Sequence, residues 1–256
     1  MKNKKTKRAV LILISVVFAL ALWQGLSAFV VKSDVLLSSP VDVIKKLWEL
    51  IFKGEFRASV WFSLSRIALG FVIALFVGTL LALLAGKYEV VEIFLIPYML
   101  TVKSVPVASF IVLALIWLTS SELSVFISFL MVLPIIYTNT LSGIRNTDAK
   151  LIEMADVFDV PFKKRLFAVW LPSLRPFLVS GAKVSLGLAW KAGIAAEVIG
   201  IADGSIGERL YYSKVYLDSA SLLAWTVVIV AFSVSFEKLF VFLLKKLLDR
   251  TEKLWI

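Results

Sequence analysis

The strongest constraint on the fold is a series of six long apolar stretches. They cover residues 9–31, 60–86, 93–119, 123–144, 176–200 and 219–244. A helix needs about 20 predominantly apolar residues to cross a bilayer, and each stretch is long enough. Lone strands cannot satisfy their backbone hydrogen bonds in lipid, so each stretch is predicted to be a helix. The sequence therefore predicts an all-α integral membrane protein, a six-helix bundle in one domain over residues 1–256.

The composition supports a membrane protein and excludes several kinds of chemistry. Hydrophobic residues make up 60% of the 256-residue chain and charged residues 18%, against about 25% charged residues in soluble domains. The net charge of +10 indicates contact with a lipid surface rather than with nucleic acid. The chain has no cysteine and no histidine, which excludes disulfides, the usual zinc sites and imidazole catalysis. We expect this chain to bind no cofactor.

Basic residues predict how the helices cross the membrane. The first stretch follows five Lys and Arg residues within residues 1–8, as a signal peptide would. Its 23 uncharged residues exceed the ~7–15 of a signal core, so a retained span is favoured. If the spans alternate from a cytoplasmic N-terminus, inner segments hold 16 Lys and Arg and outer segments seven. This bias predicts that both termini are cytoplasmic.

Two stretches carry small residues at every fourth position. The series are Gly70, Ala74, Gly78, Ala82 and Gly86 in one stretch and Gly181, Ser185, Ala189 and Gly193 in another. In lipid, such faces allow helices to approach closely. Filler residues in a lipid-facing helix are the alternative, but two long series favour packing faces. Glu197 occupies the next position of the second series, so it is predicted to face the protein interior.

Residues 145–175 form a polar insert that is predicted to lie in the cytoplasm. Asp148 can cap a first helix, and Pro161 disfavours helix at the residue before it. A second helix is expected to start near Pro161 and to end at Pro172 and Pro176. Two amphipathic helices outside the lipid suggest docking to another protein. A solvated loop that folds back on the bundle is an equally good interpretation of the residues alone.

The insert resembles the cytoplasmic EAA loop of permease subunits of ABC importers, whose pattern is E-A-A-x3-G-x9-I-x-L-P. Aligned on Glu153, the pattern places Met154 and Ala155 at the alanines and Leu171 and Pro172 at the Leu-Pro. Asp159 stands at the glycine, and an Asp adopts left-handed backbone more readily than most residues, so a turn is still expected. The resemblance implies that the following residues contact an ATPase: Glu153, Met154, Ala155, Asp156, Phe158, Asp159, Val160, Pro161, Leu171 and Pro172.

Other segments resemble the nitrate, taurine, sulfonate and thiamine-precursor branch of these permeases. They are SLSRIALGF (63–71), KSVPVASFIVLALIWL (103–118), LPIIYTNTLSGIRNTD (133–148), SLGLAWKAGIAAEVIG (185–200) and GSIGERL (204–210). The resemblance implies the type I importer permease fold, a homodimer, two cytoplasmic ATPase subunits that hold ATP and Mg²⁺, and an extracytoplasmic solute-binding protein. The chain contains no GxxxxGK[ST] motif, so it is not expected to hydrolyse ATP itself.

Ionisable residues within the apolar stretches are costly, so they are candidates for a function. Lys103 lies between Pro97 and Pro106, where a kinked helix can expose it to a cavity. Lys191 and Glu197 are six residues apart and do not face each other on a helix. A role for these three residues in the translocation pathway and a role in structural ion pairs both remain open. A secondary transporter or channel working alone is the alternative function, although no internal repeat supports it; a membrane-embedded enzyme is disfavoured.

Overall fold

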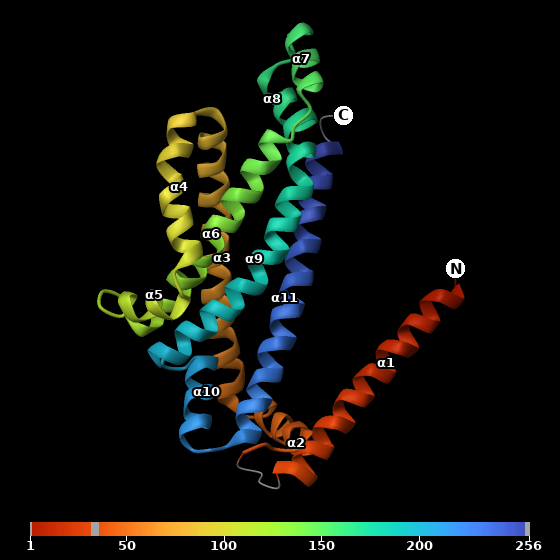
Figure 1. The fold of residues 1–256 in the computed structure, drawn as a ribbon, viewed down its shortest axis with the longest axis vertical. Helices are drawn as coiled ribbons and strands as arrows, with labels where there is room; N and C mark the ends of the chain where they lie inside the picture. The colour runs from red at the N-terminus through yellow and green to blue at the C-terminus, as the bar shows by residue number, and fades with distance from the viewer. Residues whose placement is uncertain (1, 32–35, 254–256) are drawn as a thin grey trace.

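The structure is a computed structural model, and it describes residues 2–31 and 36–253. Within these ranges the chain forms helices joined by short connections (Figure 1). They are α1 (Lys2–Gly25), a π-helical turn (Leu26–Val31), α2 (Pro40–Ile51), α3 (Gly54–Lys87), α4 (Glu89–Ser104), α5 (Val107–Ala114), α6 (Ser120–Arg145), α7 (Ala149–Val157), α8 (Phe162–Arg165), a second π-helical turn (Leu166–Trp170), α9 (Leu171–Gly200), α10 (Ile206–Val215) and α11 (Ser219–Lys253).

Four helices among the described residues are long and apolar enough to cross a membrane. They are Val10–Phe29, Gly54–Lys87, Ser120–Arg145 and Ser219–Arg250. The pair formed by α4 and α5 makes a fifth candidate if it is counted as one bent span. The predicted span at 176–200 lies within α9, whose 30 residues include Arg175, Lys183, Lys191 and Glu197. These charges keep α9 outside the apolar set, so the count of six crossing helices stays a prediction.

The predicted span over 93–119 is divided into two helices, where a single kinked helix was expected. Helix α4 ends at Ser104, and α5 begins at Val107 after a bend of 100°. The proline ring of Pro106 clashes with helical backbone at the preceding residue, and Val105 is extended with φ −77° and ψ 133°. The stretch is apolar enough to cross a bilayer, but its backbone turns sharply within it.

The predicted packing faces are confirmed, and both lie against α6. A Cβ added to Gly70 on α3 would stand 2.3 Å from the carbonyl oxygen of Val125 on α6. A Cβ added to Gly193 on α9 would stand 2.7 Å from Oγ of Ser128, also on α6. Only glycine permits these approaches, because its missing side chain lets the two backbones meet. Helix α6 is therefore the centre of the bundle, with α3 and α9 packed on it.

The two ends of the bundle differ in what they carry. Helices α7 and α8, the turn between α3 and α4, and the C-terminal end of α11 lie at one end in Figure 1, while α2 and α10 lie at the other. The predicted alternation of spans requires this segregation. Helix α1 meets the bundle near α2 and angles away from it (Figure 1), and its apolar side chains between Val10 and Leu22 are largely exposed.

Candidate functional site

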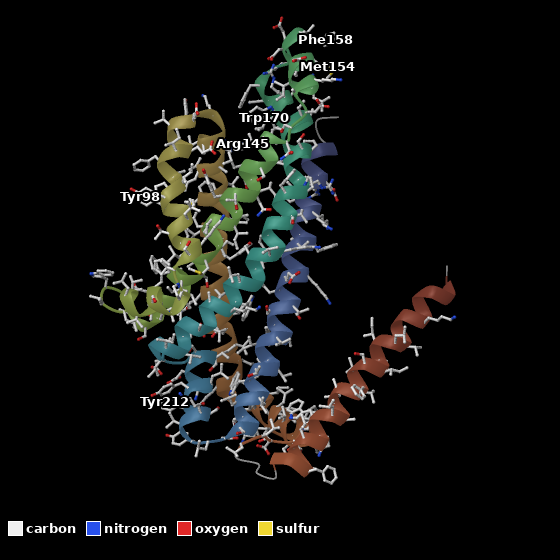
Figure 2. All side chains as sticks on the ribbon, viewed as in Figure 1. Tyr98, Arg145, Met154, Phe158, Trp170 and Tyr212 are labelled. Atoms are coloured by element: carbon white, nitrogen blue, oxygen red, sulfur yellow. The ribbon has the colours of Figure 1, made fainter. Side chains whose placement is uncertain are left out.

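The polar insert projects from one end of the bundle as a helix, a turn and a second helix. Asp148 caps α7 as predicted, because its Oδ1 accepts a hydrogen bond of 2.9 Å from the backbone N–H of Lys150. Such a cap satisfies one of the donors that the first turn of a helix leaves free. Figure 2 shows Met154 and Phe158 near the tip of this projection and Tyr212 near the opposite end of the molecule.

The turn after α7 forms in spite of the aspartate at the motif's glycine position. Asp159 has a positive φ of 45°, the left-handed conformation that glycine adopts most easily and aspartate tolerates. The N–H of Val160 donates to the carbonyl of Ala155 at 2.9 Å, and the N–H of Asp159 donates to that of Asp156 at 3.1 Å. These two bonds close the helix end in the Schellman pattern. The expected turn is therefore present.

The expectation that Pro172 ends the second helix is wrong. Helix α8 continues through the π-helical turn Leu166–Trp170 directly into α9. The N–H of Leu171 donates to the carbonyl of Leu166, five residues back, so the backbone widens just before the proline. A wider turn accommodates a residue that lacks an N–H, which removes the reason for the helix to stop. The insert is thus joined to α9 without a break.

The predicted coupling residues fall into three groups. Glu153, Met154, Asp156, Phe158, Asp159 and Pro161 are exposed on the projection, with Val160 half-buried beside them. Ala155 is only 1% exposed, so it packs inside the projection and cannot itself meet a partner. Leu171 and Pro172 are half-buried at the start of α9. An ion pair between Arg165 of α8 and Asp156 of α7 joins the two helices.

Glu197 is fully buried, as its place in the small-residue series predicted. Its Oε2 accepts hydrogen bonds from Oγ–H of Ser63 on α3 at 2.7 Å and from the N–H of Gly207 on α10 at 3.2 Å. Ser63 in turn accepts a bond of 3.0 Å from the N–H of Ile206. Glu197 and Ser63 thus cap the start of α10, where backbone N–H groups favour a negative partner. Through these bonds Glu197 holds α10 against α3 and α9.

Sequence reasoning did not find Ser63 or Gly207. Ser63 lies 134 residues from Glu197, and no spacing rule joins residues so far apart. Gly207 had a usable signal, because a glycine inside a helix implies a close neighbour. A Cβ on Gly207 would stand 2.3 Å from Cβ of Glu197, so α10 can dock at Glu197 only with glycine at this position.

The two predicted pathway lysines lie apart from Glu197. Lys103 lines a groove between α4 and α6 together with Tyr137 and Thr138, which agrees with the expectation that a kink exposes it to a cavity. Lys191 is exposed on α9. Within residues 2–31 and 36–253, neither lysine forms an ion pair with another side chain. Lys103 thus lies in a groove, Lys191 on an exposed surface and Glu197 in the buried cap of α10.

Comparison with known proteins identifies the family. Residues 70–253 match the family described as binding-protein-dependent transport system inner membrane component. The matched region runs from the middle of α3 to the end of α11 and includes the projection. The chain belongs to this family of importer permeases.

Individual relatives place the permease in one branch of the family. It is 33% identical over 187 residues to a Bacillus subtilis protein named "Putative aliphatic sulfonates transport permease protein SsuC". The aligned residues cover 72% of this chain and 67% of the relative. It is 26% identical over 217 residues to the nitrate import permease protein NrtB of Synechococcus elongatus, covering 80% and 77%. A probable ABC transporter permease of Brucella melitensis is 27% identical over 208 residues, covering 81% and 83%. The permease is thus an ABC importer subunit of the nitrate and sulfonate branch.

Proposed function

We propose that this permease forms the membrane path for a small anionic solute, such as a sulfonate or nitrate, and takes its energy from partner ATPases. An extracytoplasmic binding protein delivers the solute at the end that carries α2 and α10. Two ATPase subunits dock at the end that carries α7 and α8, and a second copy of the permease completes the path. The names of the sulfonate and nitrate relatives support the class of solute.

The observation that carries the coupling part of this proposal is the surface of the projection. Val157, Phe158 and Phe162 are 78%, 74% and 76% exposed, although the projection extends past the α3–α4 turn and the end of α11 (Figure 1). Exposed apolar clusters of this kind mark interaction sites. The buried Ala155 and the Asp156–Arg165 ion pair fix the two helices, so the projection can transmit a push into the continuous α9.

A charge placed on this surface tests the docking proposal. Phe158→Glu should abolish copurification of the ATPase subunits and the stimulation of ATP hydrolysis, because a carboxylate cannot be buried in an apolar contact without a large cost. Tyr216→Glu is the matched control, since Tyr216 is 76% exposed and lies at the other end of the molecule, after α10. It should leave ATPase binding intact.

The outcome that would reject this coupling surface is specific. A Phe158→Glu permease that copurifies with its ATPases and stimulates hydrolysis normally would exclude the projection as the docking site. A permease that transports a sulfonate or nitrate without any ATPase subunit would instead favour the alternative of a transporter or channel that works alone.

A further inference from the structure

The groove between α4 and α6 has the chemistry of an anion site. Its cavity volume is about 280 Å³, close to the lower end of the range for small-molecule sites. Six polar residues line it: Glu92, Lys103, Tyr137, Thr138, Ser142 and Arg145. The other lining residues are apolar, so a few convergent polar groups stand on an apolar wall, as in sites that select a small solute.

The charged residues that line the groove include one cation, Lys103, that is not compensated by a carboxylate. Glu92 forms an ion pair with Arg145 at the end of the groove near the α3–α4 turn. Lys103 stands eleven residues further along α4 than Glu92, about 16 Å along the helix axis. No carboxylate among the described residues pairs with Lys103. A groove with a net charge of +1 is electrostatically complementary to a monovalent anion.

A second observation points to a ligand independently of charge. Tyr137 also lines the groove, and its side chain is only 3% exposed. Its hydroxyl is buried and has no hydrogen-bond partner in the described part of the chain. Buried hydroxyls are normally paired, because a lost hydrogen bond is not compensated. An unpaired donor and an unpaired cation along one groove are what an oxyanion would satisfy.

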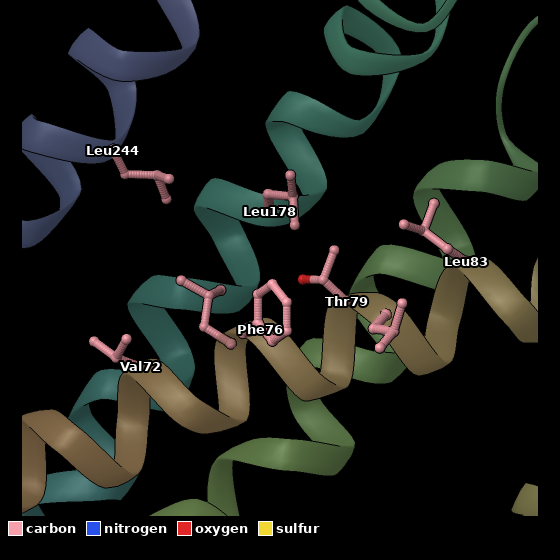
Figure 3. Close-up of a pocket in the computed structure, with 8 residues that line it drawn as sticks. Val72, Phe76, Thr79, Leu83, Leu178 and Leu244 are labelled. Atoms are coloured by element: carbon pink, nitrogen blue, oxygen red, sulfur yellow. The ribbon is translucent and has the colours of Figure 1, made fainter.

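A lipid-facing surface does not explain these residues. Ionisable side chains on a helix that faces lipid are rare, and they normally border water or another protein. The groove between α3, α9 and α11 shows the contrast: its cavity is about 400 Å³, and Thr79 is its only polar lining residue (Figure 3). That groove suits acyl chains, whereas the α4–α6 groove requires a polar occupant.

We propose that the α4–α6 groove binds a monovalent oxyanion, with Lys103 as the counterion and the Tyr137 hydroxyl as a hydrogen-bond donor. The bend after Ser104 places Lys103 in the last turn of α4, so the site lies where the backbone changes direction. This inference rests on the proposed function in one respect: it takes the transported solute to be the anion. The same chemistry would also hold the headgroup of an anionic lipid. The experiment below separates a small anion from a lipid headgroup by asking which of them protects a cysteine in the groove from labelling.

A single cysteine in the groove can report on its charge, because the natural chain has none. Thr138→Cys would be placed in the assembled importer in discs of zwitterionic lipid. It would then be labelled with sulfonatoethyl methanethiosulfonate or with the cationic trimethylammonioethyl reagent. After each rate is normalised to free cysteine, the anionic reagent should react about tenfold faster, since a cationic groove concentrates anions. Lys103→Met should remove this preference and Lys103→Arg should keep it. Thr79→Cys in the apolar groove should show no preference.

Protection experiments identify the occupant. Methanesulfonate should slow the labelling of Thr138→Cys, and dimethyl sulfone, a neutral molecule of similar shape, should not. The proposal would be overturned if Thr138→Cys reacted at equal rates with Lys103 present and with Lys103→Met. It would also be overturned if methanesulfonate and dimethyl sulfone protected the cysteine equally. Protection by added phosphatidylglycerol but not by methanesulfonate would also overturn it, because the groove would then hold a lipid headgroup. Ser142→Cys supplies a second reporter in the same groove if Thr138→Cys does not fold.

These outcomes are separable from those of the proposed function. Normal ATP-driven uptake of a sulfonate with no charge preference in the groove would sink the anion site alone. A charge preference in the groove without ATPase coupling through the projection would sink the coupling proposal alone.

Discussion

Glu197 is the single residue whose burial has the clearest energetic consequence. Its carboxylate accepts bonds from Ser63 and from the N–H of Gly207. Glu197→Leu leaves both donors without an acceptor, and each unsatisfied buried group costs about 1–3 kcal/mol. Glu197→Gln keeps an acceptor oxygen of the same shape. The unfolding temperature of the purified permease should therefore fall strongly in the leucine variant and less in the glutamine variant.

An exposed glutamate provides the control for this comparison. Glu153→Leu on the projection removes a carboxylate that contacts solvent, and surface substitutions usually change stability by less than about 0.5 kcal/mol. If Glu197→Leu unfolds at the same temperature as Glu153→Leu, the bonds to α10 contribute nothing to the fold.

Asp218 gives a prediction for pH dependence. Burial raises the pKa of its carboxyl, but hydrogen bonds from Ser221 and the nearby Lys46 ammonium outweigh burial and hold that pKa below its ordinary value. The carboxylate caps α11, because Oδ1 accepts from the N–H of Ser221 at 2.9 Å. Its contribution to stability is therefore fully present above the ordinary pKa of about 3.9, and it is lost as the pH falls through the lower folded value.

The measurement is the unfolding temperature of Asp218→Asn across pH. The variant should be less stable than the parent by the same amount from pH 8 to pH 5, with the difference shrinking only below about pH 4. A difference that already shrinks between pH 7 and pH 5 would mean that folding raises the pKa of Asp218 instead of lowering it.

Among the elements, the small-residue face of α3 is the one that the sequence predicted most directly, and it packs on α6. Gly70→Ala should destabilise the permease by about 1–3 kcal/mol, because the new Cβ would lie 2.3 Å from the carbonyl oxygen of Val125. Gly187→Ala is the matched control, since no atom lies within 4 Å of a Cβ added there. Equal unfolding temperatures for the two variants would show that the helices do not pack through Gly70.

The elements also show where prediction from sequence stops. Spacing at every fourth residue was enough to find the faces of α3 and α9, because the helical period fixes which residues share a face. A kink near Pro106 was expected, but not a break into two helices, and the continuous path through Pro172 was not expected at all. Each depends on whether the backbone around a proline turns sharply or widens by one residue, and tertiary packing decides that. The hydrogen bonds of Glu197 to Ser63 and Gly207 could not be predicted either, because they join three helices whose packing the sequence pattern does not specify.

The whole molecule separates two kinds of surface at its two ends. The end with α7 and α8 carries the exposed apolar projection, while the other end carries α2 and α10, with Lys46 of α2 3.6 Å from Asp218. Because α8 continues into α9, and α9 reaches the buried cap of α10 through Glu197, one long helix connects the two ends. A partner that moves the projection would therefore act on the α10 end through a rigid element rather than through a flexible loop.

The sidedness of the molecule gives the last prediction. The excess of Lys and Arg in inner segments predicts that the end with α7 and α8 is cytoplasmic, and Figure 1 places α7 and α10 at opposite ends. Reporter fusions made after residue 148 should be active only as a cytoplasmic reporter, such as a fluorescent protein. Fusions after residue 210 should be active only as an exported phosphatase. A fusion after residue 88, in the α3–α4 turn, should behave like the one after 148, because both lie at the same end. Equal behaviour of the fusions after 148 and 210 would break this topology, since the segment between them would then cross the membrane an even number of times.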